Sequence, residues 1–174
     1  SFELALAEML EAEYEEYYIY IACHGNGRKL ENMHLTSALD AINRQAKAKN
    51  IIGVVTGACL VGENVTHFEV FSESSFIVWQ FGYKCSVNWL DGTLIDLKVF
   101  DTLIGLTEPH LYDREEVIAL FQLALTDFRP DASIGTNKKD DPMPLSSSLT
   151  LVIQPRGQGH KAKDNSSDLF DIDG

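Results

Sequence analysis

Two hydrophobic segments separated by a helical pattern are the strongest constraint that this sequence places on its fold. Residues 17–23 and 51–58 are rich in Tyr, Ile and Val, and such short runs are typical of buried strands. Between them, residues 34–49 repeat their apolar side chains at the 3.6-residue spacing of a helix. A strand, a crossover helix and a second strand form a βαβ unit, whose two strands are parallel. The sequence therefore predicts an α/β fold.

The remaining patterns extend this arrangement along the chain. We expect a mainly parallel central sheet with helices on both faces. Strands are expected at 76–81 and 148–153, 84–89 is either irregular or a strand, and helices are expected at 2–16, 65–71, 92–104 and 113–128. The segment 129–147 is rich in Asp, Lys, Pro and Ser, so we expect an exposed loop there. We interpret 1–154 as one domain and the polar residues 155–174 as a disordered acidic tail.

Composition and charge narrow the classes of partner and compartment. The chain has 174 residues, of which 45% are hydrophobic, and this suits one globular domain with a core. The net charge of −12 argues against a nucleic-acid partner, because phosphate binding needs clustered Lys and Arg. The three cysteines form no CxxC pair, which favours a reducing cytoplasm over a disulfide framework. No apolar run approaches the ~20 residues of a membrane helix, and no residue spacing indicates a metal or cofactor.

A reactive side chain follows each of the two segments of the βαβ unit. His24 and Gly25 come directly after the first segment, and Cys59 comes directly after the second. Parallel neighbouring strands end at the same edge of a sheet, where open α/β sheets place their sites. We therefore expect His24 and Cys59 to lie side by side. A thiol beside an imidazole is the minimum requirement for a cysteine nucleophile.

Three blocks of sequence in this order resemble the caspase-like cysteine peptidases, including their bacterial CHAT-type branch. The first block, 19–25, ends in His24-Gly25, and the second, 53–62, contains Ala58-Cys59. The third block, 82–91, resembles the segment of that family in which a Ser and a Trp precede residues of the substrate cleft. The resemblance implies a caspase-like three-layer sandwich. The family has a strand, a helix and a strand ahead of the first helix, so we expect the peptidase domain, 1–154, to be N-terminally incomplete, either because the chain is truncated, because it is a processed fragment or because the fold is reduced.

The same resemblance assigns roles to individual residues. Cys59 would be the nucleophile and His24 its proton-transferring partner, and the backbone N–H groups of Gly25 and Cys59 would form the oxyanion hole. Trp89 would be a wall of the substrate cleft. Asp91 would either read a basic P1 side chain or only cap the helix that follows. Many relatives carry an acid or Gln two residues before the nucleophile, whereas this chain has Gly57 there.

The resemblance also predicts a substrate and a setting. The expected function is cleavage of a protein partner without a cofactor, in regulated proteolysis or bacterial defence, with a regulatory or activating protein as a further partner. A catalytically inactive caspase-like binding subunit is an alternative, because the front strands are missing and Gly57 departs from the pattern.

Two other features of the sequence admit alternative interpretations. Asp91, Asp96 and Lys98 superficially resemble a PD-(D/E)xK nuclease core, in which carboxylates hold a divalent ion. That interpretation requires residues 96–98 to form a strand, and both the helical periodicity and the acidic net charge oppose it.

The end of the chain, 168–173, is either a docking or inhibitory tail or an inert, solubilising one.

Overall fold

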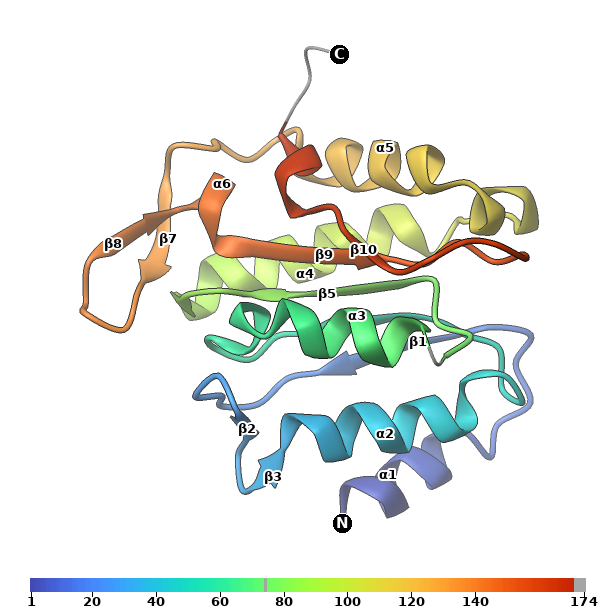
Figure 1. Ribbon diagram of the computed structural model, residues 1–174. Helices are drawn as coiled ribbons and strands as arrows, with labels where there is room; N and C mark the ends of the chain where they lie inside the picture. Colours follow the sequence, from blue (N-terminus) through green and yellow to red (C-terminus); the bar gives the residue numbers. More distant parts are fainter. Residues whose placement is uncertain (74, 171–174) are drawn as a thin grey trace.

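A five-stranded mixed sheet forms the centre of the protein (Figure 1). The computed structural model describes residues 1–73 and 75–170. The strands follow the spatial order β1 (Tyr17–Ile21), β4 (Ile51–Thr56), β5 (Trp79–Tyr83), β9 (Leu149–Ile153) and β10 (Lys163–Asp164). All six residues of β4 are buried, as expected for a strand covered on both faces. The strand β1 lies at one edge of the sheet.

The βαβ unit predicted from the sequence is present. The helix α2 (Leu35–Ala46) connects β1 to β4, and these two strands are parallel neighbours. The strand β5 is parallel to β4, but β9 is antiparallel to β5 and β10 is antiparallel to β9. The prediction of a mainly parallel sheet is therefore replaced by a mixed sheet. The reason is that two successive helices follow β5, so the chain returns to the edge at which β5 ended before it enters β9.

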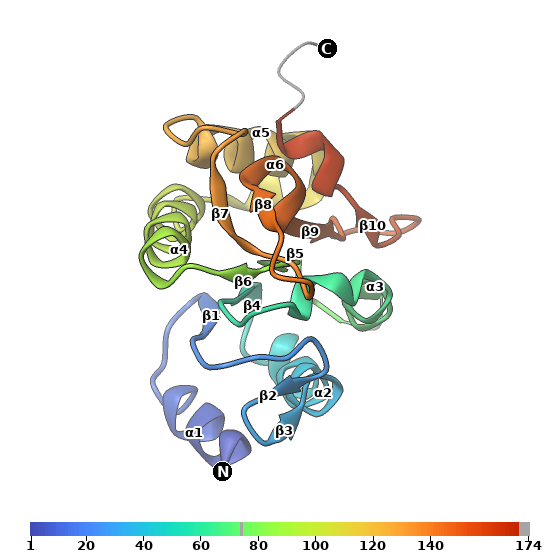
Figure 2. The ribbon, with the colours of Figure 1, turned by 90° about the vertical axis from the view of Figure 1, so that its left-hand side faces the viewer.

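Helices cover both faces of the sheet (Figure 2). The helices α1 (Phe2–Met9), α2 and α3 (Val65–Glu73) contribute to one hydrophobic cluster. The helices α4 (Trp89–Leu103) and α5 (Arg114–Leu125) contribute to a second cluster against the other face. The expected helix 2–16 is shorter than predicted, because α1 ends at Met9 and the acidic residues after it lie outside the helix.

Shorter elements complete the fold at the periphery of this sheet. They are β2 (Lys29–Leu30) with β3 (Met33–His34), β6 (Ser86–Val87) with β7 (Ser133–Thr136) and β8 (Pro142–Pro144), α6 (Leu145–Ser148), and the 3₁₀ helices η1 (Val61–Glu63), η2 (Glu108–Tyr112) and η3 (Ser166–Leu169). The expected exposed loop 129–147 is therefore wrong. The strand β7 pairs with β6, and Ile134 and Leu145 are buried in the same cluster as α4 and α5.

The segment 155–170 belongs to the folded structure, so the predicted disordered tail is wrong for these residues. The strand β10 extends the sheet, and Leu169 is only 1% exposed. The Arg114 guanidinium on α5 donates to the carbonyl oxygens of Ile153 and Lys161 and to the side-chain oxygen of Asn165, at 2.6–2.8 Å. Residues 171–174, which include the end of the proposed docking tail, lie outside the described residues. Every helix in the described part of the chain is too short or too polar to span a lipid bilayer.

Candidate functional site

The ends of β1 and β4 bring the two predicted reactive residues to the same edge of the sheet. Ile21 pairs with Thr56 at the last position of the two strands, and the N–H of Gly57 donates to the carbonyl of Ile21 at 2.9 Å. His24 lies three residues beyond Ile21, and Cys59 lies three residues beyond Thr56. The equal offsets in two parallel neighbours place both residues beyond the carboxyl end of the sheet, as the sequence predicted.

Gly25 is in direct contact with the backbone of Cys59. A Cβ atom at position 25 would lie 2.7 Å from the carbonyl oxygen of Cys59 and 3.1 Å from its nitrogen. Only a residue without a side chain can therefore occupy this position without moving the two strand ends apart. Among the described residues, no hydrogen-bond acceptor is bound to the N–H of Gly25 or to that of Cys59. Both donors are therefore available to a ligand at this point.

A sharp turn of the chain exposes the Cys59 side chain. Leu60 has a left-handed backbone with φ of 65°, which is uncommon for a residue with a branched side chain, and its N–H donates to the carbonyl of Cys85 at 3.0 Å. The Ser86 hydroxyl contacts the Cys59 sulfur at 3.8 Å as a hydrogen-bond donor. No hydrogen bond joins this sulfur to His24 within the described part of the chain. The thiol is half-buried beside β6.

The main chain at His24 is held by a residue that the sequence analysis did not identify. The N–H of Glu31 donates to the carbonyl of His24 at 2.8 Å, and the Glu31 carboxylate accepts from the N–H of His24 at 3.1 Å. The Asn26 side chain supports the intervening turn, because it accepts from the N–H groups of Arg28 and Lys29. The His24 backbone is thus fixed, while the residue is exposed to solvent.

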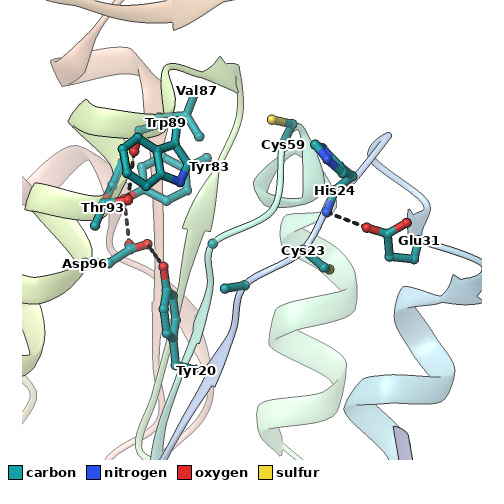
Figure 3. Close-up of a pocket in the computed structure, with 13 residues that line it drawn as sticks. Tyr20, Cys23, His24, Glu31, Cys59, Tyr83, Val87, Trp89, Thr93 and Asp96 are labelled. Atoms are coloured by element: carbon teal, nitrogen blue, oxygen red, sulfur yellow. Dashed lines mark hydrogen bonds between the residues drawn. The ribbon is translucent and has the colours of Figure 1, made fainter. Parts of the chain in front are cut away.

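An open pocket of about 440 Å³ lies between these strand ends and α4 (Figure 3). Its lining residues come from the ends of β1, β4 and β5, from the turn between β2 and β3, from the β6 segment and from α4. They are Tyr20, Ala22, Cys23, His24, Glu31, Gly57, Cys59, Tyr83, Val87, Trp89, Gly92, Thr93 and Asp96. In Figure 3 the Cys59 sulfur is turned toward the wall that contains Val87 and Trp89. The two reactive residues therefore border a space large enough for a side chain of a ligand.

The helix α4 supplies one wall of this pocket through three residues of one helical face. Trp89, Thr93 and Asp96 are spaced i, i+4 and i+7, so they lie above one another along the helix. Trp89 is 81% exposed, and Asp96 is 3% exposed. The wall therefore changes from an exposed indole to a buried carboxyl group over two helical turns.

The Asp96 carboxyl group is held by two tyrosines of the sheet. The Tyr20 hydroxyl donates to one carboxyl oxygen at 2.9 Å, and the Tyr83 hydroxyl donates to the other at 2.6 Å. Burial raises the pKa of Asp96 to about 6, and the two hydrogen bonds limit this rise. Burial also raises the pKa of Tyr20 to about 12, so this phenol remains a donor at neutral pH. A Cβ at Gly57 would lie 2.9 Å from the Asp96 carboxyl oxygen, so Gly57 leaves room for this arrangement.

The structure brings together His24, Gly25, Cys59 and Trp89 but not Asp91. Asp91 is in the first turn of α4, where its carboxylate accepts from the Asn88 side chain at 3.0 Å, and it does not line the pocket. Asn88, not Asp91, is the N-cap residue of α4. The acid of α4 that lines the pocket is Asp96, and the helical spacing from Trp89 was the signal in the sequence that could have identified it.

The nuclease alternative does not survive the observed secondary structure. It required Asp96, Leu97 and Lys98 to lie on a strand, whereas all three lie within α4. In the described residues, no three His, Cys, Asp or Glu side chains come together as a candidate metal site. Comparison with protein-family models, with curated proteins and with solved structures finds no match to this chain.

Proposed function

We propose that this protein is a caspase-like cysteine endopeptidase, in which Cys59 is the nucleophile and His24 transfers the proton. The observation that carries the proposal is the contact between Gly25 and Cys59 at the ends of two parallel strands. It sets a thiol, an imidazole and two unpaired backbone N–H donors around the mouth of one pocket. The helices on both faces of the sheet are compatible with a caspase-like sandwich, although the sheet is mixed.

The proposed reaction proceeds through a thioester. His24 takes the thiol proton of Cys59, and the sulfur bonds to the carbonyl carbon of the scissile peptide. The carbonyl oxygen becomes negatively charged and accepts hydrogen bonds from the N–H groups of Gly25 and Cys59; a donor of this kind contributes about 3 kcal/mol in other enzymes. The C–N bond then breaks, and His24 gives its proton to the leaving amine. Water attacks the thioester, His24 accepts a proton from it, and the thiol is restored.

The resting thiol contacts Ser86 instead of His24, so the imidazole and the sulfur have to approach each other when substrate binds. Catalytic hydrogen bonds are often long in unliganded enzymes and tighten with substrate. His24 is exposed, and only its backbone is fixed by Glu31, so rotation of this side chain meets little resistance. The same Ser86 contact favours the second candidate function, an inactive binding subunit with an unactivated thiol.

The test is alkylation of Cys59 by peptidyl acyloxymethyl ketones with mixed P1 residues, read by mass spectrometry. The peptidase proposal predicts modification of Cys59 in the parent protein and its loss in His24→Ala. The matched control is His34→Ala, which removes an exposed histidine of β3 outside the pocket and should leave the modification unchanged. Modification at the same rate in His24→Ala would refute the proposed pair. Binding of a protein partner without any turnover would instead support the inactive subunit.

A further inference from the structure

We infer that the pocket floor built on Asp96 selects a ligand with a positively charged side chain, arginine or lysine. The identification of this side chain as the P1 residue of a substrate rests on the proposed function. The recognition of the cation does not, because it depends only on the pocket and on the groups that face it.

The charge of the pocket lining favours a cationic ligand. Two carboxylates, those of Asp96 and Glu31, face the pocket, and none of the described residues that line it is Lys or Arg. The remaining titratable groups around Asp96 are the phenols of Tyr20 and Tyr83, which are its hydrogen-bond donors. The net charge of −12 makes the electrostatic potential around the protein negative over longer distances as well. A ligand group in this pocket therefore meets a negative potential.

The buried Asp96 carboxylate has no cationic partner among the described residues. A carboxylate offers about four acceptor positions, and the tyrosines occupy two of them. No Lys or Arg forms a salt bridge with Asp96 among the ion pairs of the described residues. A buried charge normally has a partner of opposite sign, because its removal from water is costly. The position of this carboxylate at the floor of an open pocket leaves that partner to be supplied by a ligand.

The length of the α4 wall favours a long side chain. Trp89 and Asp96 are seven residues apart, which corresponds to about 10 Å along the helix axis. A long side chain is needed to place its charged end near the floor while its backbone stays at the mouth, close to Cys59. The exposed Trp89 indole offers a flat surface to the aliphatic stem, and indole is also the aromatic group that attracts cations most strongly. Figure 3 shows this wall facing the strand ends that carry His24 and Cys59.

Gly57 completes the floor. A Cβ at this position would lie 2.9 Å from both an Asp96 oxygen and the Tyr20 ring, so even alanine would intrude on the carboxylate. The absence of a side chain at Gly57 thus lets the Asp96 carboxylate and the Tyr20 ring lie directly against the end of β4. The carboxylate at the floor can still accept hydrogen bonds, whereas the two tyrosine hydroxyls beside it already donate their protons to it. This arrangement favours a ligand group that only donates hydrogen bonds. Guanidinium and ammonium groups have this property.

The binding experiment avoids catalysis by using the Cys59→Ala protein. N-acetyl-arginine amide is titrated against N-acetyl-citrulline amide, which has nearly the same shape but no charge, and the indole N–H resonance of Trp89 is followed by NMR. The buried Trp79 is the internal control. We expect the arginine compound to bind at least about 10-fold more tightly, in line with a charge-assisted hydrogen bond. Asp96→Asn should abolish the preference, and Asp91→Asn, on the same helix but outside the pocket, should retain it.

Two outcomes would overturn the inference. Equal affinity for the arginine and citrulline compounds would show that the floor does not read charge. Loss of the preference in Glu31→Gln, with full retention in Asp96→Asn, would move the recognition to the other carboxylate.

A cleavage assay separates this inference from the proposed function. Peptides that differ only in arginine or citrulline at one position are incubated with the parent protein. Arginine binding by Cys59→Ala without cleavage by the parent protein would refute the peptidase and support the cation site. Cleavage at equal rates of both peptides would support the peptidase and refute the cation site. Cleavage after arginine alone would support both.

Discussion

Substitution of Asp96 with Asn should make the protein less sensitive to pH over the range in which this buried carboxyl group ionises. Burial raises the pKa of Asp96 from its ordinary value of 3.8 to about 6 in the folded protein. Between these two values the folded protein keeps the proton and the unfolded chain loses it. The free energy of unfolding therefore falls as pH rises, by about 1.4 kcal/mol per pH unit. Between acidic and neutral pH, the free energy of unfolding therefore falls by about 3 kcal/mol in total.

The asparagine side chain introduced by Asp96→Asn has no proton to lose, and its amide can still bond to both Tyr20 and Tyr83. We therefore expect the free energy of unfolding of Asp96→Asn, relative to that of the parent protein, to rise by about 3 kcal/mol between acidic and neutral pH. This expectation holds whatever the difference in stability between the two proteins at acidic pH. Urea unfolding followed by tryptophan fluorescence at closely spaced pH values measures this difference, with Asp91→Asn as the control for removal of a partly exposed carboxylate. Two results would refute this expectation: the free energies of unfolding of the two proteins change in parallel with pH, or the variant becomes less stable relative to the parent protein as pH rises.

Three further outcomes test other parts of the structure. Iodoacetamide should alkylate Cys59 faster than Cys85, because burial raises the pKa of the Cys85 thiol, and equal rates would count against the proposed nucleophile. Gly25→Ala should abolish modification of Cys59 by the peptidyl ketones, because the new methyl group would force the strand ends apart, whereas Gly105→Ala, with nothing within 4 Å, should be neutral. Leu169→Ala should cost about 2–5 kcal/mol in urea unfolding, and a cost near zero would mean that the C-terminal segment lies outside the core.

The βαβ unit was predictable because its signals are local. The two strands are short, continuous apolar runs, and the helix between them has a regular period, so no distant contact was needed to recognise them. The direction of β9 follows from the number of helices between β5 and β9. Two helices return the chain to the edge of the sheet at which β5 ended, so β9 runs antiparallel to β5. Both helices were visible in the sequence, so the mixed sheet was within reach of sequence reasoning.

The C-terminal segment was not predictable from composition. Its residues are mostly polar, and order comes from single long-range contacts, such as the Arg114 guanidinium reaching Asn165 and the burial of Leu169. A composition average over the segment gives such contacts no weight. Within the candidate site, Cys59 and His24 could be identified because each follows the end of a predicted strand. Glu31 could not, because it reaches the site through a turn and contacts a backbone N–H. Its role depends on a left-handed backbone at Glu31, with φ of 52°, which the sequence does not signal.

The position of β1 at the edge of the sheet makes occupancy of the site measurable without any reaction. This strand carries Tyr20 and leads into His24, yet it has a neighbouring strand on only one side. An edge strand opens at a lower free energy than a central one, so the backbone amides of β1 should exchange with deuterium sooner than those of β4. A ligand held between α4 and the strand ends ties Tyr20 to Asp96 and slows this local opening. Exchange protection confined to β1 would therefore report binding at the pocket.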